Sequence, residues 1–347
     1  MNRTVFAVLA MLAHAAAQAE AAPPQPPRLP NGLALTPPMG WISRHAACKA
    51  DERTIRAAAD QLVASGMRDA GYRYVVLDDC WQGPRDTEGQ LTPDAKRFPS
   101  GLKKLADYVH AQGLLFGLAT GAGKQSCAGG PGGRGHEYQD ARQFAAWGVD
   151  YLRADWCHTG TQNAKSTYET INDSARNIVL AIADDGKNQA WLWGLNIANS
   201  WIGGDASFAG PGHWNDPGLL DKPTRAQFSK WALLAAPLMV TGPAFTNREV
   251  IAVDQDALGI QGTRLSEGED EVWFKPLAGG ARAVGFFNNS KQARTMRVAS
   301  EALGLPATLR LAVRDLWQGR DLPAASGSVA AEVPAQGVVM LKLEGQR

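Results

Sequence analysis

The sequence has almost no net charge and, after its first residues, no long apolar run. Its 347 residues carry 35 Lys and Arg against 34 Asp and Glu, which gives a formal net charge of +1. Proteins that bind DNA, RNA or an anionic membrane surface usually carry a basic excess, so this balance argues against those partners and favours a neutral substrate. No later segment reaches the roughly 18 uninterrupted apolar residues of a membrane-spanning helix, which argues against an integral membrane protein.

Several motifs that would identify an enzyme class are absent. The sequence contains no G-x-S-x-G segment, which argues against an α/β-hydrolase. The segment GAGK at 121–124 resembles part of a phosphate-binding loop, but Leu118 lies five positions before Gly123 and Gln125 follows Lys124, so the Walker pattern fails. Paired C-x-x-C spacing and a histidine cluster are also missing. We therefore expect no metal site and no metal or organic cofactor.

The N-terminus has the pattern of an export signal. A positive start at Asn2 and Arg3 precedes a short apolar stretch at 5–17, and the A-x-A triplet at 17–19 is typical of a cleavage site. We predict a signal peptide at 1–19, a Pro-rich extended lead-in at 20–32, and a mature protein exported to the periplasm or the extracellular space.

The chain has four cysteines, which in an exported protein predict two disulfides with three alternative connectivities. Cys48 and Cys80 follow the first and second expected strands, and Cys127 and Cys157 follow the third and fourth. Because adjacent loops on one barrel face can meet, we predict the pairs Cys48–Cys80 and Cys127–Cys157. Each would close a loop of roughly 30 residues and contribute on the order of 3–4 kcal/mol in the chain-entropy description.

Strands and helices alternate along most of the chain. In the first half we expect strands at 36–41, 73–77, 114–118 and 149–154, and helices at 51–65, 102–112, 137–147 and 164–183. In the second half the candidate strands are 190–193, 199–201, 212–214 and 238–241, with a helix at 225–235. This alternation predicts parallel βαβ units, and the length suits a TIM (β/α)8 barrel at 33–262. From about Leu265 short alternating runs predict a C-terminal antiparallel β-sandwich at 263–347.

Carboxylates follow two of the expected strands. Asp155 ends the apolar run at 148–155, and the strand at 73–77 is followed at once by Asp78 and Asp79. The carboxyl ends of strands in a βα array open into the active-site mouth, so these side chains are candidates for catalysis. The competing interpretation is that they are helix N-caps, which strand-to-helix loops often carry.

A set of motifs in this order resembles glycoside hydrolase family 27, the α-galactosidase and α-N-acetylgalactosaminidase family. The motifs are TPPMGW (36–41), LDDCW (77–81), FPSG (98–101), YLRADWC (151–157), AGPGHWNDP (209–217), VIAVDQD (250–256), VRDLW (313–317) and PAQGVVML (334–341). The resemblance covers the chain from about Leu33 to the C-terminus and implies a TIM barrel followed by an antiparallel β domain.

The resemblance also implies roles for individual residues. Asp155 occupies the nucleophile position of a retaining mechanism, in which a carboxylate attacks the anomeric carbon. Asp78 and Asp79 match the pair that accepts hydrogen bonds from sugar hydroxyls. Arg153 stands where the family has Lys, and a cation there favours the ionised nucleophile.

The chain departs from the family at several sugar contacts. Arg44 replaces a Trp, Ala119 and Gly121 replace a Tyr and an Asp, Ile202 replaces an Arg, and Gly218 replaces an Asp. After its fifth strand the family has a turn with a Glu that contacts the sugar, and the segment WLWG at 191–194 offers no carboxylate to match it. Half of the family's sugar shell is therefore expected to be missing.

The acid/base residue has two candidates. Asp205 is the first choice, although it could instead be a loop residue beside a deletion. Asp216 is the second, but before Pro217 it is expected to tie down a turn. Asp184 and Asp185 lie in a polar DDGK segment and are expected to be solvated.

The leading hypothesis is an exported retaining α-galactosidase with a carbohydrate substrate. The alternatives are a degenerate galactose-binding barrel without turnover and a hydrolase of an α-N-acetylgalactosaminide or a β-L-arabinopyranoside. The sequence contains no indication of the oligomeric state.

Overall fold

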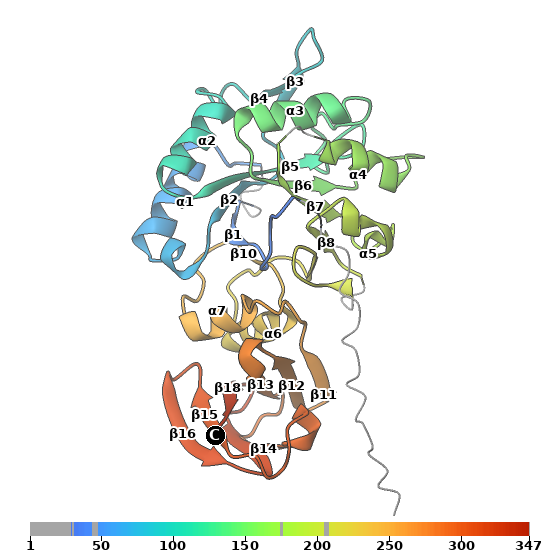
Figure 1. Ribbon diagram of the computed structural model, residues 1–347. Helices are drawn as coiled ribbons and strands as arrows, with labels where there is room; N and C mark the ends of the chain where they lie inside the picture. The colour runs from blue at the N-terminus through green and yellow to red at the C-terminus, as the bar shows by residue number, and fades with distance from the viewer. Residues whose placement is uncertain (1–28, 30, 44–47, 174–175, 205–207, 347) are drawn as a thin grey trace, which may run out of the picture.

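The computed structural model describes residues 29, 31–43, 48–173, 176–204 and 208–346, and it contains a barrel of eight parallel strands (Figure 1). The strands are β1 (Met39–Ile42), β2 (Tyr74–Leu77), β5 (Leu115–Gly121), β6 (Tyr151–Asp155), β7 (Val179–Ala183), β8 (Ser200–Ile202), β9 (Trp214–Asp216) and β10 (Leu238–Val240). They pair in the order β10-β1-β2-β5-β6-β7-β8-β9. Leu220, beyond β9, bridges Val240 of β10 in parallel and closes the ring.

Helices cover the outside of the barrel (Figure 1). They are α1 (Glu52–Ala64), α2 (Leu102–Ala111), α3 (Glu137–Trp147), α4 (Ala164–Asn172), α5 (Ala190–Trp193), α6 (Arg225–Leu234) and α7 (Arg248–Asp254). Polar residues begin several of them: Asp51 accepts from the Thr54 N–H at 2.8 Å, and Thr224 and Asn247 cap α6 and α7 in the same way. Gly148, with φ of 83°, ends α3 in the left-handed conformation that glycine adopts at low cost.

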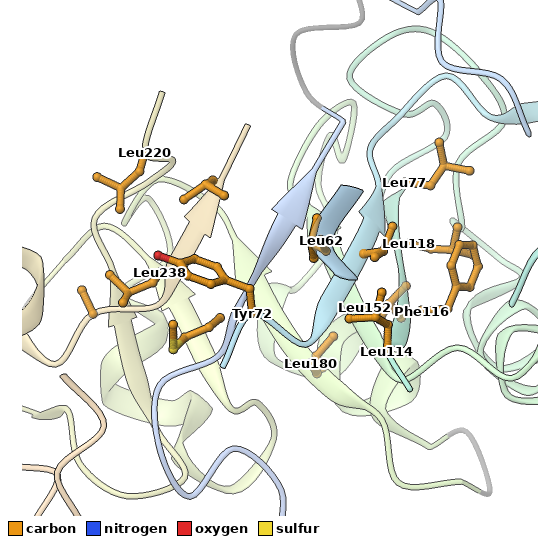
Figure 2. Close-up of a cluster of buried hydrophobic side chains, with 14 of the residues drawn as sticks. Leu62, Tyr72, Leu77, Leu114, Phe116, Leu118, Leu152, Leu180, Leu220 and Leu238 are labelled. Atoms are coloured by element: carbon orange, nitrogen blue, oxygen red, sulfur yellow. The ribbon is translucent and has the colours of Figure 1, made fainter. Parts of the chain in front are cut away.

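Four leucines show which face of each strand packs against the helices and which face points into the barrel. Leu77, Leu118, Leu152 and Leu180 are register partners on β2, β5, β6 and β7, and they pack in the buried core with the inner faces of the helices (Figure 2). Side chains alternate between the two faces of a strand. Asp155 lies three positions beyond Leu152 and therefore points to the opposite face, into the barrel. Truncating one of these leucines to Ala would lower the free energy of unfolding by about 2–5 kcal/mol.

A smaller apolar cluster fills the barrel interior below the site. Its buried members are Ile42, Val76, Tyr151, Val179, Ala181 and Met239. Val76 packs close to Gly117 of β5, where an added Cβ would lie 2.8 Å from the Val76 side chain. The interior at this level is therefore a packed core rather than a channel.

The fifth strand corrects the sequence prediction. The expected helix at 164–183 ends at Asn172, and β7 follows at Val179–Ala183, whereas the predicted strand at 190–193 is the short helix α5. All five residues of β7 are buried, as is usual for a central parallel strand, so its sequence shows no alternation that would separate it from a buried helix. The expected strand at 212–214 is β9, shifted to Trp214–Asp216.

An antiparallel β-sandwich follows the barrel (Figure 1). One sheet has the order β11-β12-β13-β18-β15-β16, and β14 pairs with β17 in the other. The strands are β11 (Thr263–Ser266), β12 (Asp270–Pro276), β13 (Arg282–Asn288), β14 (Arg294–Ala299), β15 (Leu311–Asp315), β16 (Arg320–Ala325), β17 (Ser328–Val333) and β18 (Val338–Gly345). Side chains from both sheets, including Phe286 and Val298, form one buried cluster.

Polar contacts attach the sandwich to α6 and α7. The Lys230 ammonium of α6 lies 2.8 Å from the Glu271 carboxylate of β12. The buried Lys275 ammonium donates to the carbonyl oxygens of Ala232 and Val253, and the Trp317 indole N–H donates to the Ser229 hydroxyl at 2.8 Å. Burial lowers the pKa of Lys275 to about 8, so its carbonyl partners offset only part of the cost of burying this amine.

Two disulfides join neighbouring loops at the carboxyl end of the barrel. Cys48 is bonded to Cys80 and Cys127 to Cys157, with Cα–Cα distances of 5.2 Å in both, which is the predicted pairing. A hairpin of β3 (Gln82–Arg85) and β4 (Leu91–Pro93) follows the first disulfide. The predicted signal peptide lies outside the described residues. Among the helices that are described, none has both the length and the apolar character needed to cross a bilayer.

Candidate active site

A cavity of about 390 Å³ opens at the carboxyl ends of β1, β2, β6 and β7. Five carboxylates and two cations line it: Asp78, Asp79, Asp155, Asp184, Asp185, Arg153 and Lys187. All four cysteines also belong to its wall, so the two disulfides hold the loops that surround the acids. The structure thus brings together Asp78, Asp79, Arg153 and Asp155, the candidates that the sequence placed at two strand ends.

Asp155 is the last residue of β6, and it is held by Arg153 two positions earlier on the same face of the strand. The Arg153 Nε donates to Oδ1 of Asp155 at 3.0 Å, and Nη2 lies 2.9 Å from the same oxygen. Within the described part of the chain, Oδ2 has no hydrogen-bond donor. One carboxylate oxygen is therefore fixed by the guanidinium and the other is available for chemistry.

Asp155 is only 6% exposed. Burial raises its pKa to about 6, the negative charges of Asp78 and Asp79 act in the same direction, and the Arg153 guanidinium opposes them. A buried carboxyl in a cavity with a raised pKa is a pattern that active sites share.

The raised pKa predicts a pH dependence. A carboxylate attacks carbon only when it is ionised, so we expect kcat/KM to fall about tenfold per pH unit below a midpoint near pH 6. Replacing Arg153 by Gln removes the cation that lowers this pKa, so the midpoint should move to higher pH. Rates for an activated aryl glycoside between pH 4 and pH 8 give the midpoint for the wild type and for Arg153→Gln. A midpoint near 4 in the wild type would show that burial does not control the nucleophile.

Asp78 and Asp79 differ in what surrounds their carboxylates. Both oxygens of Asp79 accept backbone hydrogen bonds, Oδ1 from the Cys80 N–H at 2.6 Å and Oδ2 from the Ala128 N–H at 2.9 Å. Asp79 therefore ties one disulfide loop to the other. The Asp78 backbone N–H donates to the Ser43 hydroxyl at 3.0 Å, and no described residue donates to the Asp78 carboxylate. Asp78 has the freer carboxylate of the pair.

This difference predicts the behaviour of two matched variants. Asp79→Asn leaves one acceptor oxygen for two N–H donors, so the amide of Ala128 should exchange with solvent faster. Asp78→Asn should leave that exchange unchanged, because Asp78 does not hold the loop. Hydrogen exchange of the peptide covering 126–130 distinguishes them. Equal exchange in wild type and Asp79→Asn would mean that the carboxylate does not hold the loop.

Asp184 corrects a second expectation from the sequence. Asp184 follows β7 directly and is 1% exposed, so it is not solvated. Its two oxygens accept from the N–H groups of Gly186 and Asn188, both at 3.0 Å, which fixes the turn. Asp185 is exposed and lies 3.5 Å from the Lys187 ammonium. The end of the fifth strand therefore does carry a carboxylate, which the sequence analysis missed because it placed that strand at 190–193.

The Gly-rich loop beside the site depends on close backbone approach. A Cβ at Gly123 would lie 2.1 Å from the Cys157 carbonyl oxygen, and one at Gly132 would lie 2.2 Å from the Gly123 carbonyl oxygen. A bidentate ion pair between Arg85 and Asp140 stands behind this loop, and Arg85 also donates to the Gly132 carbonyl oxygen. Glycine is required at 123 because any side chain there would push apart the loops that carry Cys127 and Cys157.

The two acid/base candidates differ in what the structure says of them. Asp205 lies outside the described residues, as does Arg44. Asp216 ends β9, is buried and accepts from the Gly218 N–H at 2.8 Å, so it holds the turn that the sequence predicted. Asp216 is absent from the described lining of the cavity.

Comparison with known families gives two matches. Residues 36–190 match the family described as alpha galactosidase A, and residues 267–343 match the alpha galactosidase C-terminal beta sandwich domain. Among curated proteins, alpha-galactosidase A of Cellvibrio japonicus is 38% identical over 90% of this chain and 92% of its own length. Alpha-galactosidase of Coffea arabica is 39% identical over 92% of this chain and 96% of its own length.

Solved structures agree with the sequence matches. Alpha-galactosidase I from Mortierella vinacea superposes with a TM-score of 0.85 at 29% identity and covers 90% of this chain and 98% of its own. An alpha-galactosidase from Saccharomyces cerevisiae, solved with raffinose, gives a TM-score of 0.83 at 26% identity, covering 91% and 99%.

Proposed function

This chain belongs to the α-galactosidase family, glycoside hydrolase family 27, and from that premise we propose that it removes terminal α-D-galactosyl residues by double displacement with retention. Membership of this family makes the protein a glycoside hydrolase of the α-galactosidase type. The proposal for the mechanism rests chiefly on one observation: a buried Asp155 whose Oδ1 is held by Arg153 in a cavity that also presents Asp78.

In the first step, Oδ2 of Asp155 attacks the anomeric carbon of the galactosyl residue. The bond between that carbon and the leaving-group oxygen breaks, an ester to Asp155 forms, and the leaving oxygen takes a proton from the acid. Arg153 keeps Oδ1 in place, so the same oxygen is always presented. In the second step, water gives a proton to the acid's conjugate base and attacks the same carbon. The bond between that carbon and Oδ2 breaks, which regenerates the Asp155 carboxylate and releases galactose with its original configuration.

We assign the sugar hydroxyls chiefly to Asp78, whose carboxylate has no donor among the described residues. Asp79 also lines the cavity, and its second task is to hold the loop at Ala128. A carboxylate oxygen has more than one lone pair, so Asp79 can accept from a hydroxyl while it keeps its backbone bonds.

We propose Asp205 as the acid/base. In a retaining enzyme the two carboxyl groups lie about 5–5.5 Å apart on either side of the scissile bond. In the sequence, Asp205 comes shortly after β8, the sixth strand of the barrel, and only β7 lies between β8 and β6, the strand that carries Asp155. Asp216 is the alternative, but its hydrogen bond to Gly218 already gives it a structural role.

We further propose that the protein is exported, with a signal peptide at 1–19 and a barrel at 33–262 joined to the sandwich at 263–347. Two disulfides support an oxidising compartment, because disulfides persist there and are rare in the cytosol.

The proposed specificity is tested by comparing three aryl glycosides on the purified mature protein. We expect kcat/KM to be highest for the α-D-galactoside, ahead of the α-N-acetylgalactosaminide and the β-L-arabinopyranoside. A higher value for either of the others would assign the altered specificity that the chain's departures from the family's sugar contacts allow. Galactose binding without any hydrolysis would identify a degenerate binding barrel.

A further inference from the structure

Trp156 is the one aromatic residue in the described wall of the cavity. It directly follows Asp155, the last residue of β6, so it lies at the carboxyl end of that strand. The sequence has Arg at 44 and Ala at 119, where the resembling family has Trp and Tyr. An aromatic side chain is a natural partner for the apolar C–H surface of a sugar ring, and Trp156 lines the same cavity as Asp155.

Other aromatic rings hold Trp156 in place. Its ring packs on Tyr168 of α4 with centroids 5.5 Å apart and an angle of 34°, and Tyr168 stacks on Trp193 at 6.1 Å. Tyr168 is fully buried and donates its hydroxyl to the Ala154 carbonyl oxygen at 3.1 Å. The Trp193 indole N–H donates to the Asn188 carbonyl oxygen at 2.8 Å. A side chain fixed in this way loses little conformational entropy when a ligand binds.

The half-buried Trp156 also keeps a polar group available. The two other rings of the column, Tyr168 and Trp193, satisfy their polar atoms with backbone carbonyls. The Trp156 indole N–H has no acceptor among the described residues, and it is not a buried unsatisfied atom. Indole N–H groups in contact with a ligand usually find an acceptor, and a sugar offers hydroxyl oxygens.

We propose that Trp156 is a specificity-determining residue that contacts the pyranose ring bound beside Asp155 and donates its indole N–H to an oxygen of that sugar. This role rests on the proposed function, since it assumes that the cavity binds the glycone. It also explains how a site without the family's aromatic residues at 44 and 119 retains an apolar wall.

Three variants separate this role from simple packing. Trp156→Phe keeps the aromatic wall and removes the N–H, whereas Trp156→Ala removes both. Trp193→Phe is the matched control, because Trp193 belongs to the same column but not to the described lining of the cavity. Dissociation constants for D-galactose, N-acetyl-D-galactosamine and L-arabinose are measured by calorimetry, and turnover of the three aryl glycosides is measured on the same preparations.

For the sugar that binds wild type best, we expect the dissociation constant to rise about tenfold or more in Trp156→Ala and about two- to fivefold in Trp156→Phe, with a parallel rise in KM. Trp193→Phe should stay within about twofold. Thermal unfolding identifies a variant that fails to fold, and Trp156→Phe then carries the test.

Each outcome decides the question. Equal affinities in wild type and the folded Trp156 variants overturn the proposal while leaving the glycosidase intact. Equal losses in Trp156→Phe and Trp193→Phe assign Trp156 to packing and also overturn it. The expected losses in a protein that binds sugar but hydrolyses nothing support Trp156 and refute the proposed function. If no sugar of the three binds wild type, both are refuted.

Discussion

Replacing Asp155 by Asn is expected to lower kcat/KM for aryl α-galactosides by at least about a thousandfold, because an amide cannot form the glycosyl ester. The side chain keeps its size and the Arg153 guanidinium keeps an oxygen acceptor, so the cavity should keep its shape. Galactose should still bind. Steady-state kinetics and calorimetry on one preparation measure both effects.

The control for this variant makes the same chemical change elsewhere. Asp107 on α2 pairs with Lys103 at 2.8 Å, its side chain is 56% exposed and it lies outside the cavity, so Asp107→Asn should match the wild type. Activity of Asp155→Asn within tenfold of the wild type would remove Asp155 from the nucleophile role.

Asp205→Asn is expected to have an effect that depends on the leaving group. A poor leaving group needs a proton to depart, so hydrolysis of an alkyl or sugar galactoside should fall by about a hundredfold or more. An activated aryl galactoside needs no proton at the first step, so its glycosylation should be spared and the intermediate should accumulate. Azide should then restore turnover, because a small anion attacks the intermediate without a general base.

The pattern across leaving groups is what identifies the acid. If Asp205→Asn behaves as the wild type with every leaving group, then Asp205 is not the acid/base. Asp216 would become the candidate, and Asp216→Asn could be tested in the same way, because Asn keeps an oxygen that can accept from the Gly218 N–H.

The sequence was informative about the candidate site because the carboxylates that line the cavity lie at strand ends. Asp78 and Asp79 follow β2 and Asp155 ends β6, the limits of both strands can be read from short apolar runs, and parallel strands have their carboxyl ends at the same rim of the barrel. The same argument led to the correct cysteine pairs. The TIM barrel was predictable from the alternation of strands and helices, and the β-sandwich from the short alternating runs that begin near Leu265.

The sequence was uninformative where burial removes the pattern or where a backbone bond decides the role. β7 is buried on both faces, so its sequence cannot be told from the continuation of α4. Because the fifth strand was placed too late, Asp184 was not recognised as a carboxylate at a strand end. Nothing in the sequence shows that Asp79 accepts from Ala128 or that Asp78 does not, because those bonds depend on how the two disulfide loops meet. The place of Trp156 in the cavity wall follows from the same three-dimensional packing.

The central claim is that this cavity hydrolyses α-galactosides through an intermediate on Asp155. Proton NMR of the anomeric signals during hydrolysis of an aryl α-D-galactoside tests it most directly, because each displacement inverts the anomeric carbon and two restore it. We predict that α-D-galactose is the first product and that the β anomer follows only by mutarotation. Appearance of β-D-galactose first, or no release of galactose by the folded protein, would contradict the account.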